Sequence, residues 1–97
     1  MDIQKKESGR TGKLVVIENN EELADIGYLI NDEGNYVIEH TSVDEKLSGQ
    51  GVGQKLIDAM VDLARETNKK IIPACDFAKK IFQRNESRYA DIWDKRD

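Results

Sequence analysis

Residues 36–75 read YVIEHTSVDEKLSGQGVGQKLIDAMVDLARETNKKIIPAC, and this stretch decides the fold. Residues 36–43 alternate apolar and polar side chains, which predicts a β-strand. From Val52 onward, apolar residues recur every three or four positions, which predicts an amphipathic helix ending near Asn68. Residues 70–75 predict another strand. Such a strand-helix-strand unit is expected to be a right-handed parallel crossover, with ligands beyond the carboxyl ends of its strands.

Two further strands are expected before this unit. The β-branched run at residues 14–18 and the alternation at residues 23–30 predict a hairpin that turns at Asn19 and Asn20, antiparallel to the strand at 36–43. Residues 1–12 are polar and show no apolar periodicity. They are expected to form a flexible leader, so that residues 13–97 make up a single domain.

The segment after residue 75 predicts a second helix. Asp76 is a plausible N-cap, and the helix is expected to end near Asn85. Tyr89, Ile92 and Trp93 are expected to pack on the core. The predicted fold class is therefore α/β (α+β). It has a small mixed β-sheet of three antiparallel strands, a right-handed strand-helix-strand crossover to a splayed parallel strand, and a C-terminal helix.

The strand at residues 36–43 should present two different faces. Regular alternation assigns its side chains to two sets: Tyr36, Ile38, His40 and Ser42, and Val37, Glu39, Thr41 and Val43. His40 and Glu39 are therefore expected on opposite sides. In the next strand, Pro73 has no amide hydrogen, so this strand must be an edge, a bulge, or a strand whose pairing stops partway.

Composition excludes several classes of function. The chain has 97 residues and a formal net charge of -4, with interspersed charges and no basic stripe, so nucleic-acid binding is not expected. Cys75 and His40 are the only residues of their types, which excludes an intrachain disulfide and a zinc site built from several Cys and His ligands. The apolar runs are too short for a membrane span, so a cytoplasmic monomer is the default expectation.

The most specific motif is Ser48-Gly49-Gln50-Gly51-Val52-Gly53, between a predicted strand and a predicted helix. Glycines let a backbone approach a ligand closely, and a helix start offers unpaired amides to a phosphate or pyrophosphate. The spacing does not match G-x-G-x-x-G, and the Lys-Ser or Lys-Thr of a P-loop is missing. Nicotinamide binding and nucleotide hydrolysis are thus disfavoured.

This motif resembles the [Gln/Arg]-x-x-Gly-x-[Gly/Ala] signature of the GCN5-related N-acetyltransferase (GNAT) superfamily. Ser48 stands in place of the long Gln or Arg, which removes one side-chain contact to the cofactor. The chain is also similar to a small subfamily of short, single-domain, truncated GNAT-like proteins that bind acetyl-CoA. That similarity rests on His40-Thr41, residues 47–53, Ile72-Pro73-Ala74-Cys75, Phe77-Ala78, Arg84 and Tyr89-Ala90-Asp91.

The resemblance implies acetyl-CoA (coenzyme A) as cofactor. Its pantetheine arm would pair with the backbone of residues 41–43, in the gap where Pro73 stops the pairing of the two parallel strands. The acyl thioester is expected near Cys75, His40 and Glu39 or Thr41. The implied cofactor-binding residues are Thr41, Ser42, Val43, Ser48, Gly49, Gln50, Gly51, Val52, Gly53, Gln54, Cys75 and Phe77.

Three residues are catalytic candidates. Cys75 precedes a helix, which favours a thiolate that could carry the acetyl group or allow slow thioester hydrolysis, although a lone cysteine is as often a small buried hydrophobe. His40 could act as a general base or lie hydrogen-bonded at the sheet surface. Glu39 is the second candidate base, with a solvated strand carboxylate as the alternative. Lys79, Lys80 and Arg84 either meet the CoA phosphates or form a solvated helix face.

Three functions remain open. The first is an N-acetyltransferase with an unknown amine acceptor, which transfers acetyl directly or through Cys75. The second is a non-catalytic acetyl-CoA-binding or sensing module, or a subunit completed by a partner protein. The third is a structural domain without a ligand. In larger acetyltransferases, helices between the first two strands build the acceptor pocket, and only residues 19–22 are expected there in this chain.

Overall fold

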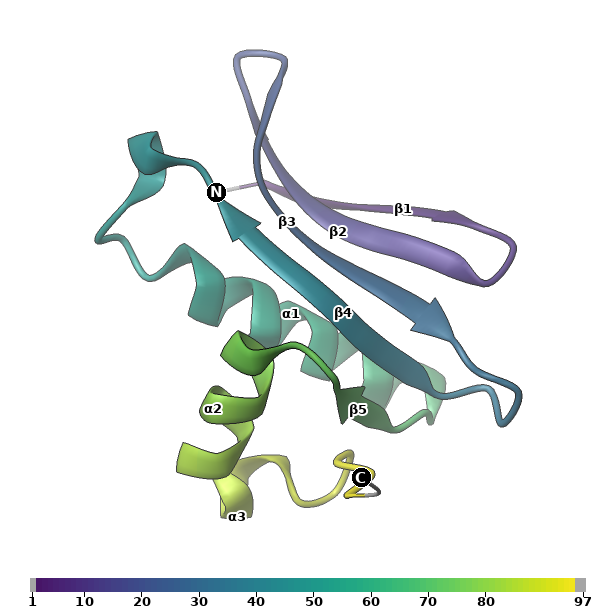
Figure 1. Cartoon of the computed structure of the whole chain (residues 1–97). Coiled ribbons are helices and arrows are strands. Elements are labelled where there is room, and N and C mark those ends of the chain that lie inside the picture. Colours follow the sequence, from purple (N-terminus) through teal and green to yellow (C-terminus); the bar gives the residue numbers. More distant parts are fainter. Residues whose placement is uncertain (1, 96–97) are drawn as a thin grey trace.

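The structure is a computed structural model that describes residues 2–95. Figure 1 shows a twisted sheet with one long helix across one face and shorter helices beside it. In chain order the elements are β1 (Ile3–Ser8), β2 (Thr11–Glu18), β3 (Glu21–Ile30), β4 (Tyr36–Val43), the 3-10 helix η1 (Glu45–Leu47), α1 (Val52–Thr67), β5 (Ile71–Pro73), α2 (Asp76–Arg84) and α3 (Glu86–Tyr89).

The sheet is mixed, as the sequence predicts, and its strands lie in chain order from β1 to β5. The strands β1 to β4 pair antiparallel, and β5 pairs parallel with β4 after the crossover through α1. The expected count of three antiparallel strands is wrong by one.

The additional strand is β1, which replaces most of the expected flexible leader. It pairs with β2 from Ile3 opposite Val16 to Ser8 opposite Thr11, through a turn in which Gly9 has a φ of 60°. Because β1 is an edge strand with almost wholly exposed side chains, backbone pairing holds it, and its sequence carries no apolar alternation. Residue 1 of the expected leader lies outside the described residues.

The pairing of β4 with β5 stops early. It covers only Tyr36 to Ile38 opposite Ile71 to Pro73, and the Ile38 carbonyl then accepts from the amides of both Ala74 and Cys75, at 3.0 and 3.1 Å. Beyond Ile38 the two segments diverge, which confirms the splayed strand expected at Pro73. No described strand covers this edge of β4 over residues 39–43.

A β-bulge at Glu39 changes the facing of β4. Tyr28 of β3 lies opposite Ile38, whereas the preceding Gly27 lies opposite His40, so Glu39 has no partner. The regular alternation expected for residues 36–43 is therefore wrong beyond Ile38. Tyr36, Ile38, Thr41 and Val43 lie on the face toward α1, and Val37, His40 and Ser42 lie on the opposite face.

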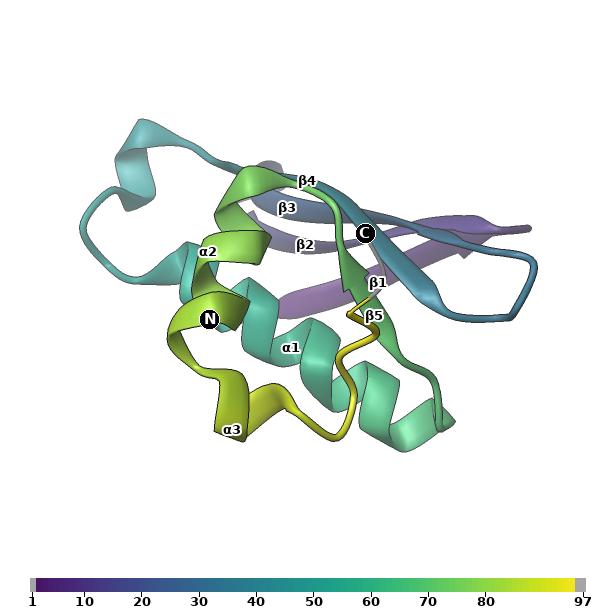
Figure 2. The same ribbon diagram turned by 60° about the horizontal axis from the view of Figure 1, so that its bottom comes forward.

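The helices build the core on one side of the sheet only (Figure 2). Seven residues of α1 are buried, and the helix is capped at its C-terminus by Asn68, whose φ is 56°, as expected. The helix α2 adds Ala78, Ile81 and Phe82 to the same hydrophobic cluster. Trp93 forms a bridge with Ile71, which ties the last described segment to β5.

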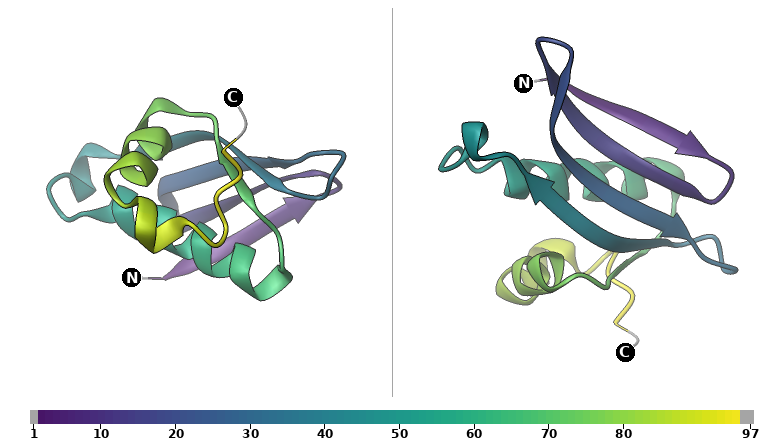
Figure 3. Two further views of the ribbon diagram at one scale, coloured as in Figure 1. Left: turned by 90° about the horizontal axis from the view of Figure 1, so that it is seen from below. Right: turned by 45° about the horizontal axis from the view of Figure 1, so that its top comes forward.

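The other face of β1 to β4 carries no helix among the described residues (Figure 3). None of the helices described within residues 2–95 is long and apolar enough to cross a membrane. Over the same range, no group of three or more His, Cys, Asp or Glu side chains is placed to hold a metal ion.

Candidate functional site

A groove of about 500 Å³ lies between the glycine-rich loop and α2. One wall is the loop with the start of α1, the other is α2, and the end of β4 closes one side. The residues that line it are Val43, Asp44, Glu45, Leu47, Ser48, Gly49, Gly51, Val52, Gly53, Gln54, Phe77, Ile81 and Arg84.

The loop is held at both ends. The Asp44 carboxylate accepts from the Lys46 amide at 2.9 Å and caps η1, and Leu47 is buried in the core. Gly49 and Gly51 then take φ values of 78° and 70°. A Cβ at either position would meet nothing within 4 Å, so the left-handed backbone, rather than crowding, is what favours glycine there.

The start of α1 presents unpaired backbone donors. Its N-cap, Gly51, has no side chain to cap the helix, and the first helical bond runs from the Lys55 amide to the Gly51 carbonyl at 3.1 Å. Within residues 2–95, no group accepts from the amides of Gly49, Gly51, Val52, Gly53 and Gln54. The first turn of α1 has no acidic residue. This arrangement suits an anion.

The groove also has an apolar part. Val43 and Phe77, which are 39% and 43% exposed, are the exposed large hydrophobic residues of the described chain, and both line the groove. Phe77 packs against Gly53 so closely that a Cβ there would lie 2.5 Å from the ring Cζ. At the third glycine of the motif, a side chain would therefore have to displace this ring.

Cys75 and Thr41 lie together, as expected. The Thr41 hydroxyl is 3.7 Å from the Cys75 sulfur, across the gap where β4 and β5 diverge. The expected N-cap Asp76 is wrong by one residue, because Cys75 caps α2 and its sulfur accepts from the Ala78 amide at 3.4 Å. The half-buried sulfur therefore has two polar neighbours.

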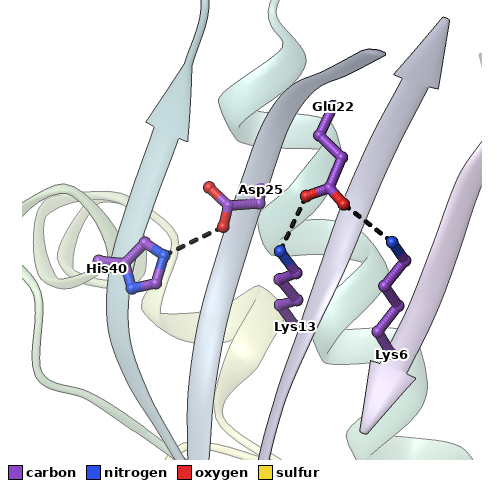
Figure 4. A network of polar contacts seen from close by, with 5 residues as sticks. All are labelled: Lys6, Lys13, Glu22, Asp25 and His40. Carbon is purple, nitrogen blue, oxygen red and sulfur yellow. Dashed lines mark hydrogen bonds and ion pairs between the residues drawn. The ribbon is translucent and has the colours of Figure 1, made fainter. Parts of the chain in front are cut away.

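His40 lies elsewhere. The bulge turns it to the helix-free face, where its Nε2 is 3.2 Å from an Asp25 carboxylate oxygen (Figure 4). The structure therefore does not bring His40 to the same face as Thr41 and Cys75. Glu39 is exposed at the bulge itself. The expectation that Cys75, His40 and Glu39 or Thr41 surround one point is therefore wrong for His40, which lies on the opposite face of β4 from Thr41.

Five other residues named as possible cofactor contacts lie partly or wholly outside the groove. The Gln54 side chain donates to the Tyr89 hydroxyl at 3.0 Å and to Asp58 at 3.3 Å, so its backbone amide is the part left to face the groove. Ser42 points away from the groove and lines a small hollow with Asp25. Lys79 lines a separate pocket beside Trp93. Gln50 and Lys80 do not line the groove.

Sequence reasoning missed Ile81, which lines the groove from α2 beside Phe77 and Arg84. Arg84 was one of the residues considered for the CoA phosphates, and the spacing of four and seven residues from Phe77 is the signal that would have placed all three on one helical face. Asp25 could not be matched to His40, because only the strand register brings these residues together across 15 positions.

Comparisons with known proteins give consistent results. A family model described as GCN5-related N-acetyl-transferase matches residues 13–92. The solution structure of a Staphylococcus aureus protein assigned as a GCN5-like N-acetyltransferase is 39% identical, with a TM-score of 0.69 over 97% of this chain and 90% of that one. No curated protein matches the chain at a significant level.

Two further solved structures are similar over part of their length. A Bacillus anthracis protein assigned as a streptothricin acetyltransferase, in complex with acetyl coenzyme A, is 26% identical, with a TM-score of 0.55 over 66% of this chain and 37% of that one. A ribosomal-protein-alanine N-acetyltransferase from Brucella melitensis is 16% identical, with a TM-score of 0.58 over 78% of this chain and 63% of that one. The second likeness shows the fold alone.

Proposed function

The chain belongs to the GCN5-related N-acetyltransferase family, and from this premise we propose that it binds acetyl-CoA in the groove and transfers the acetyl group to an amine. The observation that carries the proposal is the row of unpaired amides at Gly49 and Gly51–Gln54, which faces a groove that also contains exposed apolar side chains. A ligand with an anionic head and a largely apolar arm matches both parts.

Each part of the groove has a role in this proposal. The loop amides and Arg84 bind the phosphates, because backbone amides at a helix start and a guanidinium group both bind phosphate oxygens. Val43 and Phe77 contact the apolar portions of the arm. The uncovered edge of β4 over residues 39–43 offers backbone donors and acceptors to the amides of the arm, as a further strand would.

Cys75 supplies one of two transfer routes. In the relay route its sulfur attacks the thioester carbonyl carbon, the carbon–sulfur bond to CoA breaks, and the CoA thiolate takes up a proton. An amine then displaces the acetyl group from Cys75, loses a proton and regenerates the thiol. In the direct route the amine attacks the thioester itself, and Cys75 remains a helix cap. Intact-protein mass spectrometry distinguishes the routes, because only the relay produces an acetyl adduct that Cys75→Ser removes.

Binding is tested by titrating isotope-labelled protein with acetyl-CoA and following the backbone amide signals. The amides of Gly49 and Gly51–Gln54 should shift together and saturate, and those of β1 should not. A parallel titration with acetylated pantetheine, which lacks the nucleotide phosphates, should shift residues 41–43 but bind more weakly. If none of these signals moves at millimolar ligand, acetyl-CoA binding is refuted.

The helix-free face favours a second candidate, a non-catalytic acetyl-CoA-binding module. The turn at Gly9 and Arg10 joins β1 to β2, and the expected turn at Asn19 and Asn20 joins β2 to β3, so no described helix between these strands builds an acceptor pocket. Release of free CoA thiol with a panel of amines separates the candidates. Saturable binding without thiol release would support the module.

A further inference from the structure

A second cavity, of about 630 Å³, lies beside the end of β5. Residues 72–74 form one side of it, Lys79 and Gln83 of α2 form another, and Glu86, Trp93 and Lys95 complete the lining. We call this cavity the Trp93 pocket. No function derived so far uses it.

The helix α2 separates the Trp93 pocket from the groove of the glycine-rich loop. Phe77 and Ile81 line the groove, whereas Lys79 and Gln83 line the Trp93 pocket, and no residue lines both cavities. Positions two residues apart in an α-helix are about half a turn from each other. The two cavities are therefore separate and lie on opposite faces of one helix.

Trp93 gives the pocket an aromatic wall. The last described segment runs beside β5 (Figure 2), and Trp93 forms the bridge with Ile71. Its ring packs edge-on against the buried ring of Phe82, with the centroids 5.4 Å apart. The indole nitrogen has no hydrogen-bond partner within residues 2–95, and no buried side-chain nitrogen in that range lacks one, so this nitrogen is open to solvent. The pocket thus has a fixed ring with an accessible donor.

Two ammonium groups line the pocket, and neither has a strong ion pair. Lys79 makes no hydrogen bond or ion pair with any described residue. Lys95 lies 4.7 Å from the centroid of the Trp93 ring and 3.7 Å from a Glu86 carboxylate oxygen, well beyond the about 2.8 Å of a strong charge-assisted hydrogen bond. Glu86 is the only carboxylate among the described lining residues. The pocket therefore has a surplus of one positive charge, in a chain whose net charge is -4.

We propose that the Trp93 pocket binds a small carboxylate that carries an aromatic group. The carboxylate accepts from the Lys79 ammonium, and the aromatic group packs against Trp93 and the buried Pro73. A monoanion matches a surplus of one positive charge better than a phosphate dianion does. The cavity volume lies within the range of about 300–1,000 Å³ that is typical of small-molecule sites. This site is additional to the acetyl-CoA groove, and the inference does not rest on acetyl transfer.

Trp93 is the only tryptophan of the chain, so its fluorescence reports on the pocket directly. The probe is 3-phenylpropanoate, titrated into the full chain. It should change the Trp93 emission saturably with a Kd on the order of 1 mM, as expected for a ligand of about eleven heavy atoms. 3-Phenylpropanamide lacks the charge and acetate lacks the ring, so each should bind roughly fivefold more weakly or worse. A second titration in the presence of acetyl-CoA should give the same Kd.

Charge variants of exposed lining residues test the assignment in both directions. Lys79→Met should weaken binding of 3-phenylpropanoate roughly fivefold, because it removes the unpaired ammonium group. Lys80→Met is the matched control, since Lys80 is the next residue of α2 and lines neither cavity. Glu86→Gln should strengthen binding roughly threefold, because it removes a like charge and releases Lys95. Urea denaturation of each variant checks that the fold is kept.

Four results would overturn the inference. Equal affinity in Lys79→Met and Lys80→Met, or for the acid and its amide, would mean that no carboxylate is recognised. Equal affinity for acetate and 3-phenylpropanoate would mean that no aromatic group is recognised. Displacement of the probe by acetyl-CoA would assign the pocket to the acetyl-CoA site. Finally, the inference fails if neither Trp93 fluorescence nor the amide signals of residues 72–74 change at probe concentrations well above the expected Kd.

Discussion

Substituting Gly53 by alanine should leave the free energy of unfolding nearly unchanged and weaken acetyl-CoA binding. Gly53 lies in the first turn of α1 with an ordinary helical backbone, and the added Cβ would lie 2.5 Å from Cζ and 2.9 Å from Cε2 of Phe77. Phe77 is 43% exposed, so its ring can rotate away from α1. The substitution therefore moves a ring in the groove while the helix stays intact.

The expected magnitudes follow from these contacts. Alanine in place of glycine stabilises a helix by up to about 1 kcal/mol. Displacing a half-buried ring offsets part of this gain, so the free energy of unfolding should change by less than about 1 kcal/mol. A ring that no longer covers the arm of acetyl-CoA loses on the order of 1 kcal/mol of binding, which weakens affinity roughly fivefold.

Urea denaturation measures the first quantity, and calorimetric titration with acetyl-CoA measures the second. Phe77→Leu removes the ring without the added Cβ, so the double variant Gly53→Ala/Phe77→Leu should bind no more weakly than Phe77→Leu alone. A loss of more than about 2 kcal/mol of stability in Gly53→Ala would mean that the ring cannot move, and would refute the reasoning.

Three other substitutions have defined outcomes. Gly51→Ala places a side chain at a φ of 70° and should lower the free energy of unfolding by about 1 kcal/mol in urea denaturation, with weaker acetyl-CoA binding. Tyr89→Phe removes the hydroxyl that donates to Asp58 at 2.7 Å and accepts from Gln54, and should lower the denaturation temperature by the equivalent of about 1 kcal/mol; no change would mean that solvent replaces both bonds. Hydrogen bonds from Lys13 and Lys6 lower the pKa of Glu22 from 4.5 to about 2, so this carboxylate stabilises the fold above pH 4.5 and its contribution disappears as the pH falls toward 2. Acid unfolding of Glu22→Gln should accordingly show a weaker pH dependence over that window.

The sequence predicted those parts of the fold that depend on nearby residues: the strand β4, the end of α1 and the end of the pairing between β4 and β5. Residues 36–43 form β4 with the expected bounds, because β-branched and aromatic residues alternate there. Asn68 ends α1 through its left-handed backbone, and Pro73 ends the parallel pairing because it has no amide hydrogen.

The features that the sequence did not predict depend on contacts between residues distant in the chain. The edge strand β1 is held by pairing with β2, so its own side chains show no burial pattern. The bulge at Glu39 follows from the register against β3, in which Gly27 accommodates the ring of His40. The glycine-rich loop does line a groove, whereas the direction in which His40 points could not be predicted without the register.

The unpaired residue at position 39 bears on how this chain tolerates change. The Glu39 side chain is exposed, so many substitutions there should fold normally. Deleting Glu39 should also be tolerated, because it removes the extra residue and leaves Ile38 opposite Tyr28 and His40 opposite Gly27. His40 and Thr41 would keep their present faces. Deleting a regularly paired residue such as Val37 or Thr41 is a different perturbation, because a shift of one residue turns the side chains beyond it to the other face. A deletion scan of β4 should therefore find position 39 permissive and its neighbours not, a contrast that an alanine scan would not reveal.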